Sequence, residues 1–233
     1  MKEILESRDI IKITFDCRRD SDSLWEEYKV KLTNVLDMQL FEYMVRPIAR
    51  TNLREPFKPW HYRQQCIRGL DNTVKTYVSY SDLRMTGIRN FELVKKCGGN
   101  IMNNCRTVWR YRPLDDGLKR YAALDVEMIH LVKDTLVKKL KLDGIQLERL
   151  KVASERYASV RRDHEKPDDV YIRHQMILSH IIPEINCGVL KEFREEKMCQ
   201  GCKRMLPRSF VRNGKCEDCL EIKRVNTHRP VRM

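Results

Sequence analysis

The sequence lacks several features that would assign it to large classes of proteins. No apolar run approaches the roughly 18 residues needed to span a bilayer, and the N-terminal stretch has neither the apolar segment nor the small-residue cleavage site of a signal peptide. The adjacent glycines Gly98 and Gly99 are not followed by the Lys-Ser/Thr of a phosphate-binding loop. We therefore expect an intracellular protein, in the nucleus or cytoplasm, with no membrane association.

Negative charge is also scarce relative to positive charge. There are 46 Lys and Arg residues against 33 Asp and Glu residues, so the formal net charge is +13 at pH 7. From Lys197 to Met233, ten basic residues oppose three acidic ones, which gives +7 in that segment alone. Because a basic surface attracts polyanions, the expected partner is nucleic acid, RNA or DNA, with single strands favoured and protein partners left open.

The nine cysteines occur without an export signal, a context in which thiols and metal ligands are more common than disulfides. Five are scattered and are interpreted as small buried or half-buried hydrophobic residues. The other four form two C-x2-C pairs separated by thirteen residues: Cys199, Cys202, Cys216 and Cys219. Two such pairs can enclose Zn²⁺ in four thiolates with no open position, so the predicted zinc is structural. Between the pairs, Asn213-Gly214 predicts a β-hairpin turn.

The cysteine module allows more than one role. It can stabilise the fold and do nothing else, or it can also contact nucleic acid, and docking to a protein is a competing interpretation. The basic residues that would approach phosphates are Lys203, Arg204, Arg208 and Arg212.

The rest of the chain shows an α/β pattern. A strand is expected at residues 10–15, then a helix, then a second strand that leads into a helix, which is the order typical of α/β domains. Apolar residues at helical spacing predict helices over 114–141 and 145–165, and "GGN" at 98–100 predicts a turn. We divide the chain into a domain over 1–143, a helical extension over 144–196 and the zinc-binding module with its basic tail over 197–233.

Two stretches resemble the motifs of one enzyme family. "WRYRPLDDGLKRYAALDV", residues 109–126, is similar to the last motif of the ribonuclease D-like 3′-5′ exonucleases, in which an Arg-Pro-Leu turn precedes a Tyr-Ala-Ala-x-Asp helix. "KITFDCRRDSDSLWEEYKVKLTNVLDMQL", residues 12–40, resembles the family's second motif and the strand after it. The branch most similar to this chain is that of the 3′-5′ exonuclease domain-containing proteins.

The resemblance implies a ribonuclease H-like exonuclease fold and two-metal hydrolysis of phosphodiesters. Two Mg²⁺ or Mn²⁺ ions would be held by carboxylates and would stabilise the attacking and leaving oxygens. By the same resemblance, Asp20 and Asp125 would be metal ligands, and Tyr121 would orient or deprotonate the attacking water. Other interpretations stand beside these: Asp20 as a helix cap, Tyr121 as a core residue and Asp125 as a solvated helix residue.

The chain departs from the family pattern in one respect. The family carries a first motif, D-x-E, on an initial strand, and the residues before the strand at 10–15 contain no D-x-E. The fold is therefore expected to be a truncated one. Three explanations are open. Either the sequence comes from an incomplete gene prediction of an active enzyme, or it is a catalytically inactive family member that binds nucleic acid or protein, or the site is completed by another acid or a partner chain.

Overall fold

The structure is a computed structural model, and it describes residues 1–51, 67–85, 91–104, 107–140 and 143–162, with short stretches at 181–183, 185–186, 189–190, 196–201, 205–208, 211–216 and 219–220. The chain forms two compact units. Unit 1 comprises Met1–Ile67 and Leu142–Met233, and unit 2 comprises Arg68–Lys141. In the part of the chain that the structure describes, no helix combines the length and the apolar character needed to cross a membrane.

The N-terminal part of unit 1 alternates helices and strands. Its elements are α1 (Lys2–Glu6), β1 (Lys12–Thr14), α2 (Arg18–Tyr28), β2 (Val35–Asp37) and α3 (Met38–Thr51). β1 and β2 pair in parallel, with Ile13 opposite Leu36 and Thr14 opposite Asp37. A parallel pair requires a crossover connection, and α2 supplies it between the two strands. The predicted α/β class is confirmed.

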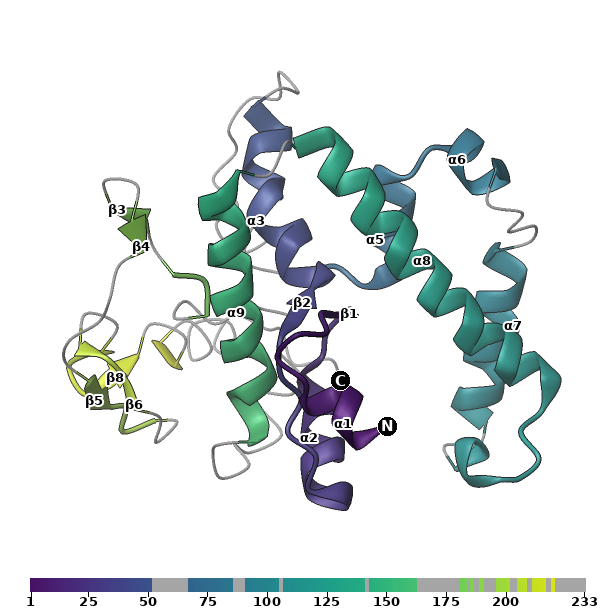
Figure 1. Cartoon of the computed structure of the whole chain (residues 1–233), viewed down its shortest axis with the longest axis horizontal. Coiled ribbons are helices and arrows are strands. Elements are labelled where there is room, and N and C mark those ends of the chain that lie inside the picture. The colour runs from purple at the N-terminus through teal and green to yellow at the C-terminus, as the bar shows by residue number, and fades with distance from the viewer. Residues whose placement is uncertain are drawn as a thin grey trace, which may run out of the picture. The chain divides into compact units, whose positions relative to one another are not determined.

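Helix α9 (Gly144–Arg162) covers this α/β part. It packs against α2, β2 and α3 (Figure 1). Leu150, Ala153 and Tyr157 are almost completely buried in that contact. The sequence places this helix in an extension that follows the α/β domain, whereas in the structure it supplies core side chains. The boundaries at 143 and 196 stay a prediction.

The C-terminal part of unit 1 contains short antiparallel strand pairs. These are β3 (Ile185–Asn186) with β4 (Val189–Leu190), β5 (Glu196–Met198) with β6 (Met205–Pro207), and β7 (Val211–Arg212) with β8 (Lys215–Cys216). The β7–β8 turn has φ of 50° at Asn213 and 75° at Gly214. Two successive positive φ angles are what a tight two-residue hairpin requires, so the predicted turn is confirmed.

Unit 2 is helical in its described part. It consists of α5 (Leu70–Tyr77), α6 (Tyr80–Met85), α7 (Phe91–Asn104), the 3₁₀ turn η1 (Val108–Arg110) and α8 (Asp116–Leu140). α8 packs against α5 and α7 (Figure 1). Asp115 caps α8, because its Oδ1 accepts hydrogen bonds from the backbone N–H groups of Gly117 and Leu118. The helix predicted over 114–141 is confirmed to within two residues at its start.

Two details of unit 2 differ from the sequence-based expectation. The predicted turn at Gly98-Gly99-Asn100 is wrong, since all three residues lie inside α7. Within α8, Val126 belongs to the apolar spacing that predicts this helix but is 56% exposed, whereas Leu118, Val132 and Leu136 of the same spacing are buried. Gly98 lies where the Tyr121 ring of α8 leaves no room for a Cβ atom, a requirement that a one-dimensional pattern does not contain.

Candidate active site

The structure brings Tyr121 and Asp125 together on one face of α8, directed towards Lys95 of α7. The Lys95 Nζ lies 2.5 Å from Asp125 Oδ1 and 3.4 Å from Tyr121 Oη. The same ammonium lies 3.4 Å from Asp71 Oδ1 on α5 and 4.6 Å from the centre of the Tyr121 ring. Three helices therefore contribute to one polar cluster inside unit 2, the Lys95 cluster, consisting of Asp71, Lys95, Tyr121 and Asp125.

Lys95 is the most enclosed charged residue of this cluster. Its side chain is 12% exposed, against 31% for Asp125 and 48% for Asp71. Desolvation by burial on its own would lower the pKa of Lys95, but the hydrogen bond to Asp125 and the negative charges of Asp125 and Asp71 raise it above its ordinary value. Lys95 is therefore a permanent cation at neutral pH.

Gly98 allows the Tyr121 ring to lie directly against α7. A Cβ atom at Gly98 would stand 2.1 Å from Tyr121 Cδ2, far inside van der Waals contact. On another side, the Trp109 ring lies 6.5 Å from the Tyr121 ring, measured between centroids, at an interplanar angle of 55°. Tyr121 is thus fixed by a helix backbone, a lysine and a second aromatic ring.

Asp20, the other predicted metal ligand, belongs to unit 1. It lies in the first turn of α2 and is exposed as a residue. Neighbouring atoms nevertheless displace part of the water around its carboxyl group. This desolvation, together with the negative charges of Asp16 and Asp37, raises the pKa of Asp20. A carboxylate in such a negative environment is stabilised by an approaching cation.

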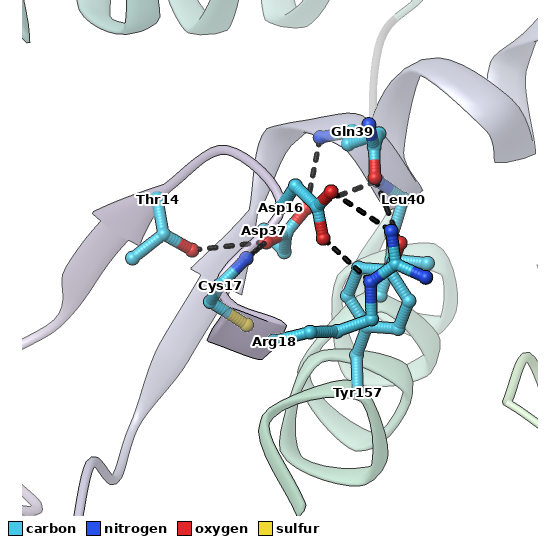
Figure 2. A network of polar contacts seen from close by, with 8 residues as sticks. All are labelled: Thr14, Asp16, Cys17, Arg18, Asp37, Gln39, Leu40 and Tyr157. Carbon is cyan, nitrogen blue, oxygen red and sulfur yellow. Dashed lines mark hydrogen bonds and ion pairs between the residues drawn. The ribbon is translucent and has the colours of Figure 1, made fainter. Parts of the chain in front are cut away.

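Asp37 has a different environment, because it is completely buried and both of its carboxylate oxygens accept hydrogen bonds (Figure 2). One of its oxygens accepts hydrogen bonds from the Cys17 backbone N–H at 2.8 Å and the Thr14 hydroxyl at 3.1 Å. The other accepts from the N–H groups of Gln39 at 3.0 Å and Leu40 at 3.3 Å. Burial raises its pKa even though the Cys17 N–H opposes the shift. Asp37 thus ties the end of β1 to the start of α3.

Arg18 and Tyr157 complete the network drawn in Figure 2. Arg18 forms a two-point ion pair with Asp16, with Nε–Oδ1 at 2.6 Å and Nη2–Oδ2 at 2.8 Å. Its guanidinium also lies 4.7 Å above the Tyr157 ring, and the Tyr157 hydroxyl donates to Gln39 Oε1 at 2.7 Å. Both acids that raise the pKa of Asp20 are therefore already partnered.

In the C-terminal module, three predicted zinc ligands converge. The sulfur atoms of Cys199, Cys216 and Cys219 all lie within 4.8 Å of one another, and those of Cys199 and Cys219 are 3.7 Å apart. Tetrahedral Zn²⁺ with Zn–S bonds near 2.3 Å places its sulfurs about 3.8 Å apart. The Cys216 N–H donates to Cys199 Sγ at 3.2 Å, which suits a thiolate acceptor. Cys202 lies outside the described residues.

Two of the four basic residues predicted to contact nucleic acid lie on the described part of the C-terminal module. Arg208 and Arg212 are exposed. Lys203 and Arg204 lie outside the described residues.

Sequence reasoning missed Lys95, Asp71 and Gly98. The helical spacing of Lys95 and Gly98, three residues apart on α7, was a usable signal that both face the same neighbour. That the neighbour is Tyr121, 26 residues after Lys95 in the chain, could not be read from the spacing.

Comparison with known proteins matches residues 1–141 to a protein family described as 3′-5′ exonuclease. Among solved structures, the chain is similar to Trypanosoma brucei RNase D, with 27% identity, a TM-score of 0.47 and coverage of 68% of this chain and 47% of that one. The chain is also similar to the complex of the same enzyme with RNA U12, with 27% identity and a TM-score of 0.48. This match covers 68% of this chain and 45% of that one. For the GMP complex of that enzyme, the identity is 26% and the TM-score 0.46, and the match covers 68% of this chain and 42% of that one. The chain thus spans less than half the length of these relatives. No match was found among curated proteins.

Proposed function

Because this chain belongs to the 3′-5′ exonuclease family, we propose that it acts on the 3′ ends of nucleic acid by metal-dependent phosphodiester hydrolysis. The observation that carries this proposal is the Lys95 cluster. Tyr121 and Asp125 lie one helical turn apart on α8, and both contact Lys95 of α7, which also pairs with Asp71 of α5. On a solvated helix face, these two side chains would contact water and not a largely buried lysine of a neighbouring helix. We place this activity inside the cell, in the nucleus or cytoplasm.

The proposed roles follow the chemistry of each side chain. Asp20 and Asp125 would be ligands of Mg²⁺ or Mn²⁺, which prefer carboxylate oxygens. When bound, the ions would supply charge stabilisation to the attacking and leaving oxygens of the phosphate. Tyr121 would orient or deprotonate the attacking water, with its ring orientation fixed by Gly98 and Trp109.

Nucleic acid is the proposed substrate class because of the charge of the chain. The formal net charge is +13, and Arg208 and Arg212 of the C-terminal module are exposed. Each Lys or Arg that neutralises a phosphate releases counterions, so binding should weaken as salt increases. Single strands stay the proposed form of the substrate.

A second candidate function is a catalytically inactive member of the family that binds nucleic acid or protein. One observation favours it: the carboxylate of Asp125 already has a cation, since Lys95 pairs with its Oδ1 at 2.5 Å.

A nuclease assay separates the two candidates. Single-stranded RNA and DNA, each labelled at the 5′ end, are incubated with the full chain and Mn²⁺ or Mg²⁺. The proposed activity predicts shortening from the 3′ end that Asp125→Asn abolishes. Asp134→Asn is the matched control, because Asp134 lies on the same helix with its side chain 55% exposed and pairs with Lys133. Salt-sensitive binding without shortening would instead establish the binding module.

We further propose that the C-terminal module binds one structural Zn²⁺ through Cys199, Cys202, Cys216 and Cys219. The convergence of three of these sulfurs supports this. Native mass spectrometry should find one zinc per chain, and Cys216→Ser should lose it. Cys97→Ser, at an exposed cysteine of unit 2, should keep it. A chain without zinc that retains its fold after residue 197 would contradict the proposal.

A further inference from the structure

The number of oxygen atoms around the Lys95 ammonium equals the number of its hydrogen-bond donors. An ammonium group has three N–H donors and no acceptor. Around Lys95 Nζ lie three oxygen atoms: Asp125 Oδ1 at 2.5 Å, Asp71 Oδ1 at 3.4 Å and Tyr121 Oη at 3.4 Å. The two carboxylate oxygens are also the hard donors that a divalent cation such as Mg²⁺ or Mn²⁺ prefers.

We propose that Lys95 is the resident cation of this cluster and competes with divalent metal ions for Asp125. A metal ion that binds Asp125 must first displace the ammonium or must bind beside it against like-charge repulsion. Lys95 would therefore set the metal-ion concentration at which the cluster is loaded. This inference rests on the proposed function, because it takes Asp125 to be a metal ligand.

The enclosure of Lys95 distinguishes this contact from an ordinary surface ion pair. Its side chain is 12% exposed, whereas the nearby Lys75–Glu92 pair joins side chains that are 55% and 79% exposed at 3.5 Å. Exposed pairs contribute little because water and salt screen them. In addition, the Lys95 Nζ lies 4.6 Å from the centre of the Tyr121 ring, a cation–π contact that holds the ammonium in place.

The same geometry gives Lys95 a second effect. While the ammonium is in place, Tyr121 Oη and Asp125 Oδ1 both contact the Nζ atom of Lys95 on α7. Lys95 is thus a positioning residue for the pair as well as a competitor for the ion. The two effects can be separated because only competition makes metal binding tighter when the charge of Lys95 is removed.

The test measures Mn²⁺ binding directly, by electron paramagnetic resonance of the free ion, on the zinc-loaded full chain. Lys95→Met removes the charge and keeps an unbranched side chain that is one atom shorter. We expect it to bind Mn²⁺ about tenfold or more tightly than the unmodified chain, since loss of one like charge at close range is worth at least that factor. Asp125→Asn in the Lys95→Met background should abolish the gain.

Lys75→Met is the matched control, because it removes the same charge from the same unit at an exposed position. It should leave Mn²⁺ affinity unchanged, so that a general charge effect is excluded. Circular dichroism shows whether each variant is folded, and Lys95→Gln replaces Lys95→Met if the latter is not.

The outcomes distinguish this inference from the proposed function. If Asp125→Asn weakens Mn²⁺ binding but Lys95→Met does not strengthen it, competition is overturned and Asp125 remains a metal ligand. If Asp125→Asn changes nothing in either background, Asp125 is not a ligand, and both the metal-dependent function and the inference fail.

Discussion

Gly98→Ala is the substitution for which the structure makes the sharpest prediction about stability. The added Cβ would lie 2.1 Å from Cδ2, 2.7 Å from Cγ and 2.8 Å from Cε2 of the Tyr121 ring. A rigid ring cannot deform, so α7 or Tyr121 must move, and overpacking of this kind costs about 1–3 kcal/mol. Replacing glycine by alanine inside a helix recovers about 1 kcal/mol.

Gly99→Ala provides the control within the same helix, because a Cβ there meets nothing within 4 Å. Both variants gain the same helix propensity, so their difference isolates the contact with Tyr121. We expect Gly98→Ala to have a free energy of unfolding about 1–3 kcal/mol lower than that of Gly99→Ala.

The assay is urea unfolding followed by tryptophan fluorescence. The chain has three tryptophans, and replacing Trp25 and Trp60 by Phe leaves Trp109 as a reporter of unit 2, next to Tyr121. In a Tyr121→Ala background the difference between the two alanine variants should disappear. Equal stability of the two variants in the presence of Tyr121 would refute the close approach of the ring to α7.

Three further predictions concern unit 1. Tyr157→Phe removes the hydrogen bond to Gln39 and should lower the free energy of unfolding by about 0.5–1.5 kcal/mol in urea titrations. Asp20→Asn should raise Tm at about pH 7, because the raised pKa of Asp20 means that its charged form destabilises the folded state; this gain should vanish as the pH falls below the ordinary value of 3.8. Replacing both Arg208 and Arg212 by Ala should weaken binding of single-stranded RNA. The slope of the logarithm of the binding constant against the logarithm of the salt concentration should also become less steep, by about 0.7 for every phosphate that these arginines neutralise.

Each of these has an outcome that would count against it. Tyr28→Phe, at a residue that is 66% exposed, should leave stability unchanged, and an equal loss there would show that Tyr157 has no special role. A Tm difference for Asp20→Asn that persists at low pH would contradict a charge origin. Weaker RNA binding with an unchanged salt slope would mean that the two arginines do not contact phosphates.

Much of the local structure could be predicted from the chain itself. The β-branched run before residue 15 forms β1, and the apolar spacing after Asp115 forms α8, because both signals act over a few residues. The Asn213-Gly214 turn was equally clear, since few other residues tolerate its backbone angles. The resemblance to the 3′-5′ exonucleases, based on short motifs, is confirmed as family membership.

The residues that contact the site residues could not be predicted from the sequence. The Asp37 N–H donates to Ser154 Oγ, 117 residues further along the chain, and α9 was assigned to an extension for lack of any local sign of this contact. Lys95 is one of 46 basic residues, and nothing in its neighbours marks it as the partner of Asp125.

The sequence by itself determined β1, α8, the Asn213-Gly214 turn, the family motifs and the pattern of thiol ligands, because each depends on residues that are close together in the chain. Tertiary structure alone decided that Lys95 pairs with Asp125, that the Tyr121 ring packs directly against Gly98 and that α9 supplies buried side chains to the core of unit 1. These outcomes depend on side-chain volume and charge meeting across helices, and only the folded chain brings those groups within contact distance.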